Sequence, residues 1–177
     1  WNGAYAGGSW ALWSLGNNAF YDGIRRYPYS SNLAKNPLML RHIQDGTPLP
    51  ATPPAAFGAD GGNNAEVHNT GEVWAVMLWD CYTAMLRDTA RYTVASATKR
   101  MREYLVGSLK LTPSSPTLLE ARDAVLAVVF ATDAQDYRLF WQAFARRGAG
   151  QGAVVPGKTS VDNVGVIESF DVSNNLL

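Results

Sequence analysis

The sequence predicts a mainly α-helical fold, a helical bundle preceded by a long irregular N-terminal arm. Its 177 residues include 47% hydrophobic and 11% aromatic residues, enough to build the core of one domain. From about residue 67, apolar residues recur every three or four positions, which is the spacing of one face of an α-helix. Before that point, Gly, Pro, Asn and Ser follow one another too closely for long helices.

Residues 1–66 are expected to form the irregular arm and cleft loops, with only short helical or extended pieces. The Pro-rich stretch 46–54 favours extended backbone, because a residue that precedes proline avoids the helical conformation. The next stretch, 58–64, consists of turn-forming residues with acidic and amide oxygens. It lacks the final glutamate of a calcium-binding EF-hand loop, so we interpret it as a turn.

Residues 67–150 are expected to form a bundle of four helices. Asn69 followed by Glu72 has the spacing of a capping box, which assigns Glu72 to helix capping ahead of the apolar segment 73–86. The second helix, 93–109, ends before Pro113.

Two further helices complete the predicted bundle. Ser115 and Pro116 indicate the start of a third helix that reaches about residue 129. The fourth covers 133–147, and Gly148 supplies its left-handed C-terminal cap. Residues 151–177 are predicted to form a C-terminal loop with a short extended segment at 164–170.

Charge and composition exclude several classes of partner. Fifteen basic and fifteen acidic residues cancel, so the chain has no global basic field to attract nucleic acid. Its apolar runs are too short to cross a bilayer, and a single cysteine, Cys81, cannot form an internal disulfide. The charged fraction is only 17%, which suggests that something outside the chain covers part of its surface. The first residue is Trp1, and we expect the chain to derive from a longer precursor.

The two histidines do not form a metal-binding pattern. Neither His42 nor His68 has a second histidine three to five residues away, so no H-E-x-x-H or zinc-finger motif exists. His68 precedes a buried helix and could be either a structural hydrogen-bonding residue or part of a site. We interpret His42 as a packed or surface histidine, and Cys81 as a buried, inert thiol.

The segment around His68 is similar to a known active-site segment. Residues 66–75, Glu-Val-His-Asn-Thr-Gly-Glu-Val-Trp-Ala, resemble the histidine segment of the fungalysin family, secreted zinc metallopeptidases related to thermolysin. Seven other segments resemble family segments in the same order: residues 2–6, 23–30, 36–43, 111–116, 121–124, 145–148 and 166–171. The resemblance covers nearly the whole chain. It implies the helical C-terminal subdomain that forms one wall of a peptidase cleft.

The resemblance also implies roles for individual residues. His68 matches the histidine that donates a hydrogen bond to the tetrahedral oxyanion, and Arg25 matches the arginine that binds a substrate backbone carbonyl. From its residue type alone, Arg25 could instead be a structural residue that ties the arm to the bundle. Related peptidases carry a histidine-orienting aspartate where this chain has Asn63, so Asn63, Glu66 or Asp60 would have to orient His68.

The family's zinc ligands and general base would lie upstream of Trp1. The sequence therefore leads us to expect the C-terminal half of a secreted zinc metalloendopeptidase, with a peptide or protein substrate. Zinc would belong to the complete enzyme, and this chain alone is expected to bind none and to be inactive. Its partner would be the upstream zinc-binding subdomain of the same precursor. The alternative is a non-catalytic helical module that binds protein or peptide and retains the fold without the metal half.

Overall fold

A computed structural model of residues 1–177 describes all of them except 13, 15–18 and 173–177. The predicted arm and C-terminal segment each include some residues outside this description. The chain divides into two compact units, Trp1–Trp79 with Val161–Val164, and Asp80–Ser160 with Gly165–Leu177. The boundary falls within helix α3 (Val67–Arg87).

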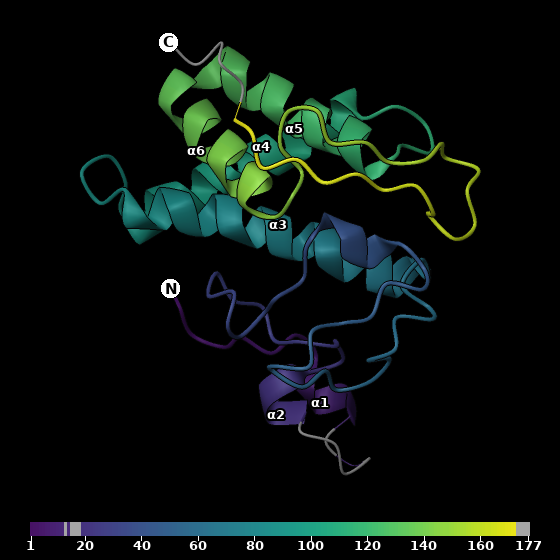
Figure 1. The fold of residues 1–177 in the computed structure, drawn as a ribbon. Coiled ribbons are helices and arrows are strands. Elements are labelled where there is room, and N and C mark those ends of the chain that lie inside the picture. The colour runs from purple at the N-terminus through teal and green to yellow at the C-terminus, as the bar shows by residue number, and fades with distance from the viewer. Residues whose placement is uncertain (13, 15–18, 173–177) are drawn as a thin grey trace. The chain divides into compact units, whose positions relative to one another are not determined.

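The first unit contains the irregular arm and the beginning of α3. The arm has two single-turn helices that lie side by side, α1 (Ser9–Leu12) and α2 (Ala19–Asp22), and a 3₁₀ turn, η2 (Leu40–Ile43) (Figure 1). Isolated bridges join Tyr5 to Tyr29 and Gly7 to Gly23. Short helical and extended pieces were predicted for this region, and the structure confirms them.

Apolar residues from the arm pack with those of α3 to form the core of this unit. Val73, Val76 and Met77 on α3 are completely buried. The arm contributes side chains that are at most 2% exposed, namely Tyr27, Leu38, Leu40 and Ile43. Burial of this apolar surface fixes the arm despite its lack of regular structure.

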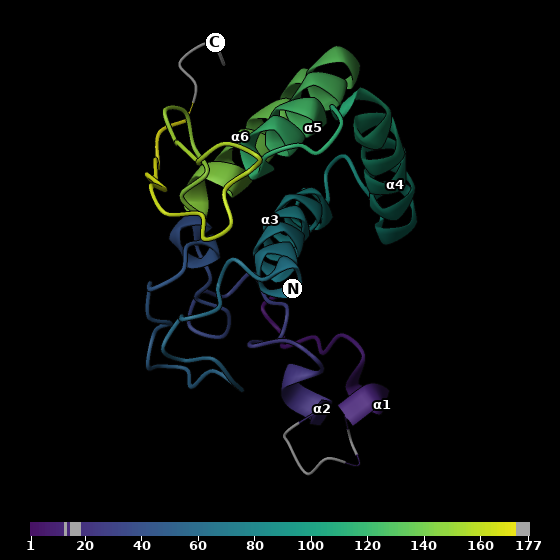
Figure 2. The same ribbon diagram turned by 90° about the vertical axis from the view of Figure 1, so that its right-hand side faces the viewer.

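The second unit holds the rest of α3 and three further helices, α4 (Val94–Leu111), α5 (Leu118–Thr132) and α6 (Ala134–Arg146). Helix α5 packs against both α4 and α6, as Figure 2 shows. Among the described residues the ordered elements are helical and the extended contacts are isolated bridges, so the mainly α fold is confirmed. Within those residues, no helix combines the length and apolar character needed to cross a membrane.

Local capping explains where the helices begin, and it corrects the predicted start of α5. Thr117, not Ser115 or Pro116, caps α5: its hydroxyl accepts the Glu120 N–H, while the Glu120 carboxylate accepts the Thr117 N–H at 2.7 Å. Asp133 caps α6 in a similar way, by accepting two backbone N–H groups.

The end of α6 follows the prediction. Gly148 has a φ of 82°, the left-handed conformation of a C-terminal cap. The chain then returns as an extended segment, where Val154 bridges Ile167 and Ala149 bridges Ser169. The buried Arg122 of α5 donates to the carbonyls of Ala149 and Gly150 at 2.9 Å, which fastens this segment to the helices.

Candidate functional site

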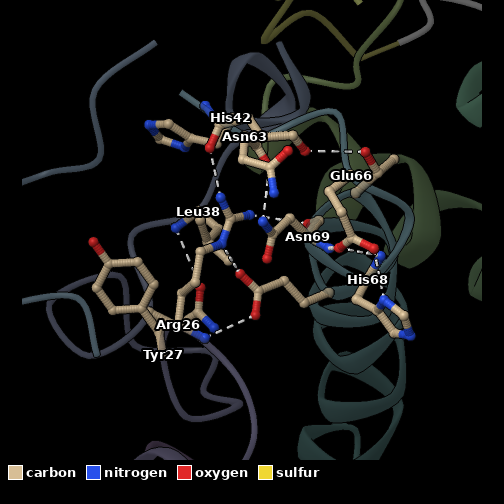
Figure 3. Close-up of polar contacts among 12 residues, drawn as sticks. Arg26, Tyr27, Leu38, His42, Asn63, Glu66, His68 and Asn69 are labelled. Atoms are coloured by element: carbon tan, nitrogen blue, oxygen red, sulfur yellow. Dashed lines mark hydrogen bonds and ion pairs between the residues drawn. The ribbon is translucent and has the colours of Figure 1, made fainter. Parts of the chain in front are cut away.

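His68 is the second residue of α3, and its side chain is 73% exposed. The Glu66 carboxylate contacts it twice: one oxygen lies 2.7 Å from the ring Nδ1, and the other accepts the His68 backbone N–H at 2.8 Å. It also accepts the Asn69 N–H at 3.2 Å. Figure 3 shows the ring of His68 beside this carboxylate. Glu66 therefore accepts backbone N–H groups at the start of the helix and also contacts the histidine ring.

This contact fixes which ring atoms of His68 face outward. An ionised carboxylate only accepts hydrogen bonds, so the Nδ1 that faces it must carry a proton. Hydrogen bonding from His68 lowers the pKa of Glu66, which favours that ionised form. The Nε2 atom at the far side of the ring is then free of Glu66. In a protonated imidazole both nitrogens are donors, so Nε2 can then donate a hydrogen bond as well.

The other two candidates for orienting His68 have different partners. The Asn63 backbone carbonyl accepts the Asn69 side-chain amide at 2.7 Å, which supports the turn before α3. Asp60 accepts the Gly62 N–H at 3.2 Å within its own turn. Of the three residues, Glu66 has the direct contact with the His68 ring.

Arg25 is half-buried, and the structure connects it to α3 through the next residue, Arg26. Arg26 is only 1% exposed and forms an ion pair with Glu72, which is 2% exposed. Its guanidinium also donates to the Asn64 side chain at 2.5 Å and to the Asn69 carbonyl at 2.9 Å (Figure 3). The arm is thus tied to the first turns of α3 by Arg26.

The prediction that Glu72 caps a helix is wrong. Helix α3 begins at Val67, and Glu72 lies in its second turn, where it pairs with Arg26. Burial raises the pKa of Glu72, and the charge of Arg26 opposes that rise. The pair was missed because its members are far apart in sequence. A glutamate directly before an apolar run such as 73–79 is nevertheless a signal of a buried partner, since isolated charges are almost never fully buried.

Comparison of the sequence with known proteins identifies a family for this chain. Residues 3–153 match the family described as Fungalysin metallopeptidase (M36). The chain belongs to the fungalysin family. It is 30% identical over 161 residues to the extracellular metalloproteinase mep of Aspergillus terreus, and 31% identical over 160 residues to extracellular metalloproteinase 3 of Trichophyton tonsurans. These alignments cover 85% and 84% of this chain but only 22% of each relative.

A third relative extends the match. The extracellular metalloproteinase MEP of Neosartorya fischeri is 29% identical over 173 residues, which is 92% of this chain and 24% of that protein. The chain therefore spans about a quarter or less of the length of these fungalysin-related proteinases.

Fungalysin membership implies a zinc ion in the complete protein, which raises the question of whether this chain could hold it. Among the residues that the structure describes, no three His, Cys, Asp or Glu side chains come together in a group able to bind a metal. His68 has Glu66 as its ring partner, and His42 is only 1% exposed with its Nδ1 accepting the Met39 N–H. These residues do not fit a zinc site.

His42 provides a test of the arm that is independent of activity. Burial, with help from Arg41 and Arg26, lowers the pKa of His42 to about 4 from an ordinary value of 6.5. The unfolded chain takes up this proton below about pH 6.5, whereas the folded chain does not. Stability should therefore be complete above that pH and should fall as the pH decreases toward 4, by at most about 1.4 kcal/mol per pH unit.

The measurement is the urea unfolding midpoint between pH 7 and pH 4.5 for the wild type and for His42→Asn. The asparagine oxygen can still accept the Met39 N–H but cannot titrate in this range. We expect the variant to lose less stability on acidification than the wild type. Parallel curves for the two proteins would contradict the prediction.

Proposed function

We propose that this chain is the C-terminal part of a secreted zinc metalloendopeptidase that hydrolyses internal peptide bonds. In the proposal, His68 donates a hydrogen bond from Nε2 to the carbonyl oxygen of the scissile bond as that oxygen gains negative charge. A donor placed where charge develops typically contributes about 2.7 to 4 kcal/mol to lowering the barrier. Zinc in the complete enzyme would supply the activated water.

The observation that carries the proposal is the contact between Glu66 and the His68 ring. The carboxylate lies 2.7 Å from Nδ1 and so directs Nε2 away from the helix start. A protonated imidazole held in this way presents one N–H to an incoming oxygen and carries the charge that complements an oxyanion. The high exposure of His68 leaves it accessible to a substrate.

Arg25 would hold the peptide next to the scissile bond. Its forked guanidinium can donate to a backbone carbonyl, and Arg26 anchors the adjacent residue to α3. Asn63 would act indirectly, by supporting Asn69 and the turn from which His68 projects. Both assignments extend the roles that the family resemblance implies.

The zinc ligands would come from the upstream zinc-binding subdomain of the same protein. Large aromatic side chains of the arm support a covering partner of this kind, since Trp10 is 79% and Phe20 is 83% exposed. These residues lie on α1 and α2, which contact one another, and exposed apolar patches commonly mark interaction sites. Secretion is proposed because the related proteins are named extracellular metalloproteinases.

The proposal predicts that Glu66→Gln in the complete enzyme lowers kcat by roughly tenfold, with little change in KM. The amide can contact Nδ1 either as a donor or as an acceptor, so the ring orientation of His68 is no longer secured. The measurement is hydrolysis of an internally quenched peptide, with a zinc chelator to establish metal dependence.

Glu120→Gln is the matched control, because Glu120 is likewise a glutamate that accepts backbone N–H at the start of a helix. It should leave kcat unchanged. If both variants behave alike, Glu66 serves helix capping alone. A complete protein that hydrolyses no peptide would instead favour the non-catalytic module.

A further inference from the structure

We infer that the buried pair of Arg26 and Glu72 fixes the position of Arg25 relative to His68. Both members of the pair are therefore positioning residues for peptide hydrolysis. The inference rests on the proposed function, in which Arg25 binds a substrate carbonyl and His68 binds the oxyanion. It adds two residues that contact neither the substrate nor the reacting atoms.

The burial of this pair is the first reason to assign it a role beyond stability. Arg26 and Glu72 are 1% and 2% exposed, and removing two charges from water costs about as much as their attraction returns. Apolar residues of similar size often stabilise a core equally well. What an ion pair adds is direction, because its hydrogen bonds fix the orientation of both side chains.

The second reason is the way Glu72 binds the backbone next to Arg25. One carboxylate oxygen accepts the Arg26 backbone N–H at 3.0 Å, and the other accepts the Arg26 Nε–H. The peptide that joins Arg25 to Arg26 is planar, so fixing its N–H also fixes the Cα of Arg25. A carboxylate on α3 thereby sets where the Arg25 side chain begins.

The third reason is that Arg26 contacts α3 immediately after His68. Its Nη2 donates to the carbonyl of Asn69, the residue that follows His68, and Glu72 lies one helical turn after His68. Its Nη1 donates to the completely buried Asn64, whose amide is in turn held by the carbonyls of Gln44 and Thr47 at 2.8 Å.

These contacts use the planar fork of arginine. Two arms of the guanidinium contact the helix start and the preceding loop, while Nε faces Glu72. The ammonium of a lysine at this position could pair with Glu72 but could not reproduce the same set of directions. The position of Arg25 relative to His68 thus depends on one rigid group. A misplacement of about 1 Å between such groups can cost on the order of 100-fold in rate.

The test replaces both charges in the complete enzyme, as Arg26→Met with Glu72→Leu. Either change alone leaves an unpaired buried charge, whereas the double replacement removes both, so the fold should be retained. We expect kcat/KM for a quenched peptide to fall at least about tenfold while the thermal midpoint stays close to that of the wild type. Full activity together with a thermal midpoint close to that of the wild type would overturn the inference.

Arg26→Lys keeps the test decisive if the double replacement folds poorly. This variant retains the buried positive charge and loses the fork, and kcat/KM should again fall by about tenfold. Arg100→Met with Glu103→Leu is the matched control, since that pair is exposed and 3.8 Å apart. The control should behave like the wild type in both activity and thermal midpoint.

A cycle with Arg25→Ala separates positioning from general structure. If the pair acts through Arg25, the double replacement should lower kcat/KM only slightly in an enzyme that already lacks the Arg25 side chain. An equal loss in both backgrounds would refute the inference. The His68→Ala variant distinguishes failure of the proposed function from failure of this inference. Wild-type activity in His68→Ala would reject the proposed function. An inactive His68→Ala, together with a fully active Arg26→Met, Glu72→Leu double variant, would reject this inference alone.

Discussion

The His68→Ala variant of the complete enzyme is expected to lose roughly 100-fold or more in kcat, with little change in KM. The reason is that the Nε2–H would bind the carbonyl oxygen strongly only after charge has developed on it. An interaction confined to the transition state affects kcat and kcat/KM equally, and ground-state binding is left intact. Steady-state kinetics on an internally quenched peptide measures both quantities.

Two controls make this result specific to the site. His68 is 73% exposed at the start of α3, so its removal should not change the thermal midpoint. His42→Asn removes the other histidine of the chain from the buried 3₁₀ turn and should leave kcat unchanged at neutral pH. A His68→Ala enzyme with near-wild-type kcat would exclude the proposed role.

The parts of the candidate site that sequence could predict are those built from neighbouring residues. Glu66 and His68 are two positions apart, so a short segment that resembles a family motif carries both the proposed functional group and the carboxylate that contacts its ring. The choice among Asn63, Glu66 and Asp60 could not be made from sequence, because all three lie within reach along the chain. It depends on where α3 begins, and the helix begins at Val67.

The parts that sequence missed depend on contacts between distant segments. Asn69 and Glu72 satisfy the spacing of a capping box, yet Glu72 forms an ion pair with Arg26 of the arm instead of capping the helix. A buried arginine requires a charged partner, and this tertiary contact overrides the capping role that the local sequence favours. For the same reason, the sequence indicated a role for Arg25 but not the contacts that its neighbour Arg26 makes with α3.

The starts of α4, α5 and α6 depend on local capping residues. The starts of α4 and α6 were predicted to within one residue, because Thr93 and Asp133 cap them with their own side chains. For α5, Pro116 suggested the first helical position, but Thr117 and Glu120 form a complete reciprocal cap, and the helix begins two residues later, at Leu118. The stronger local pair decided the boundary.

The largest effect on stability is expected at Asp136, a completely buried carboxylate of α6. It accepts the hydroxyls of Tyr92 at 2.5 Å and Tyr104 at 2.7 Å, and the guanidinium of Arg91 at 2.7 Å. Burial, followed by the hydrogen bond to Asp136, raises the pKa of Tyr104, so that hydroxyl stays a donor across the working range. Asp136→Ala should lower the free energy of unfolding by about 3 to 5 kcal/mol.

Most of that loss should come from the tyrosine hydroxyls that lose their acceptor rather than from Arg91. Arg91 keeps ion pairs with Asp88 and Asp133, whereas Tyr104 is 1% exposed and would have no acceptor. Tyr104→Phe alone should therefore cost only about 1 kcal/mol, and adding it to Asp136→Ala should cost much less than the sum. Urea unfolding followed by circular dichroism measures each step of this cycle. Strict additivity, or a loss at Asp136 below about 1 kcal/mol, would show that the carboxylate does not hold these helices together.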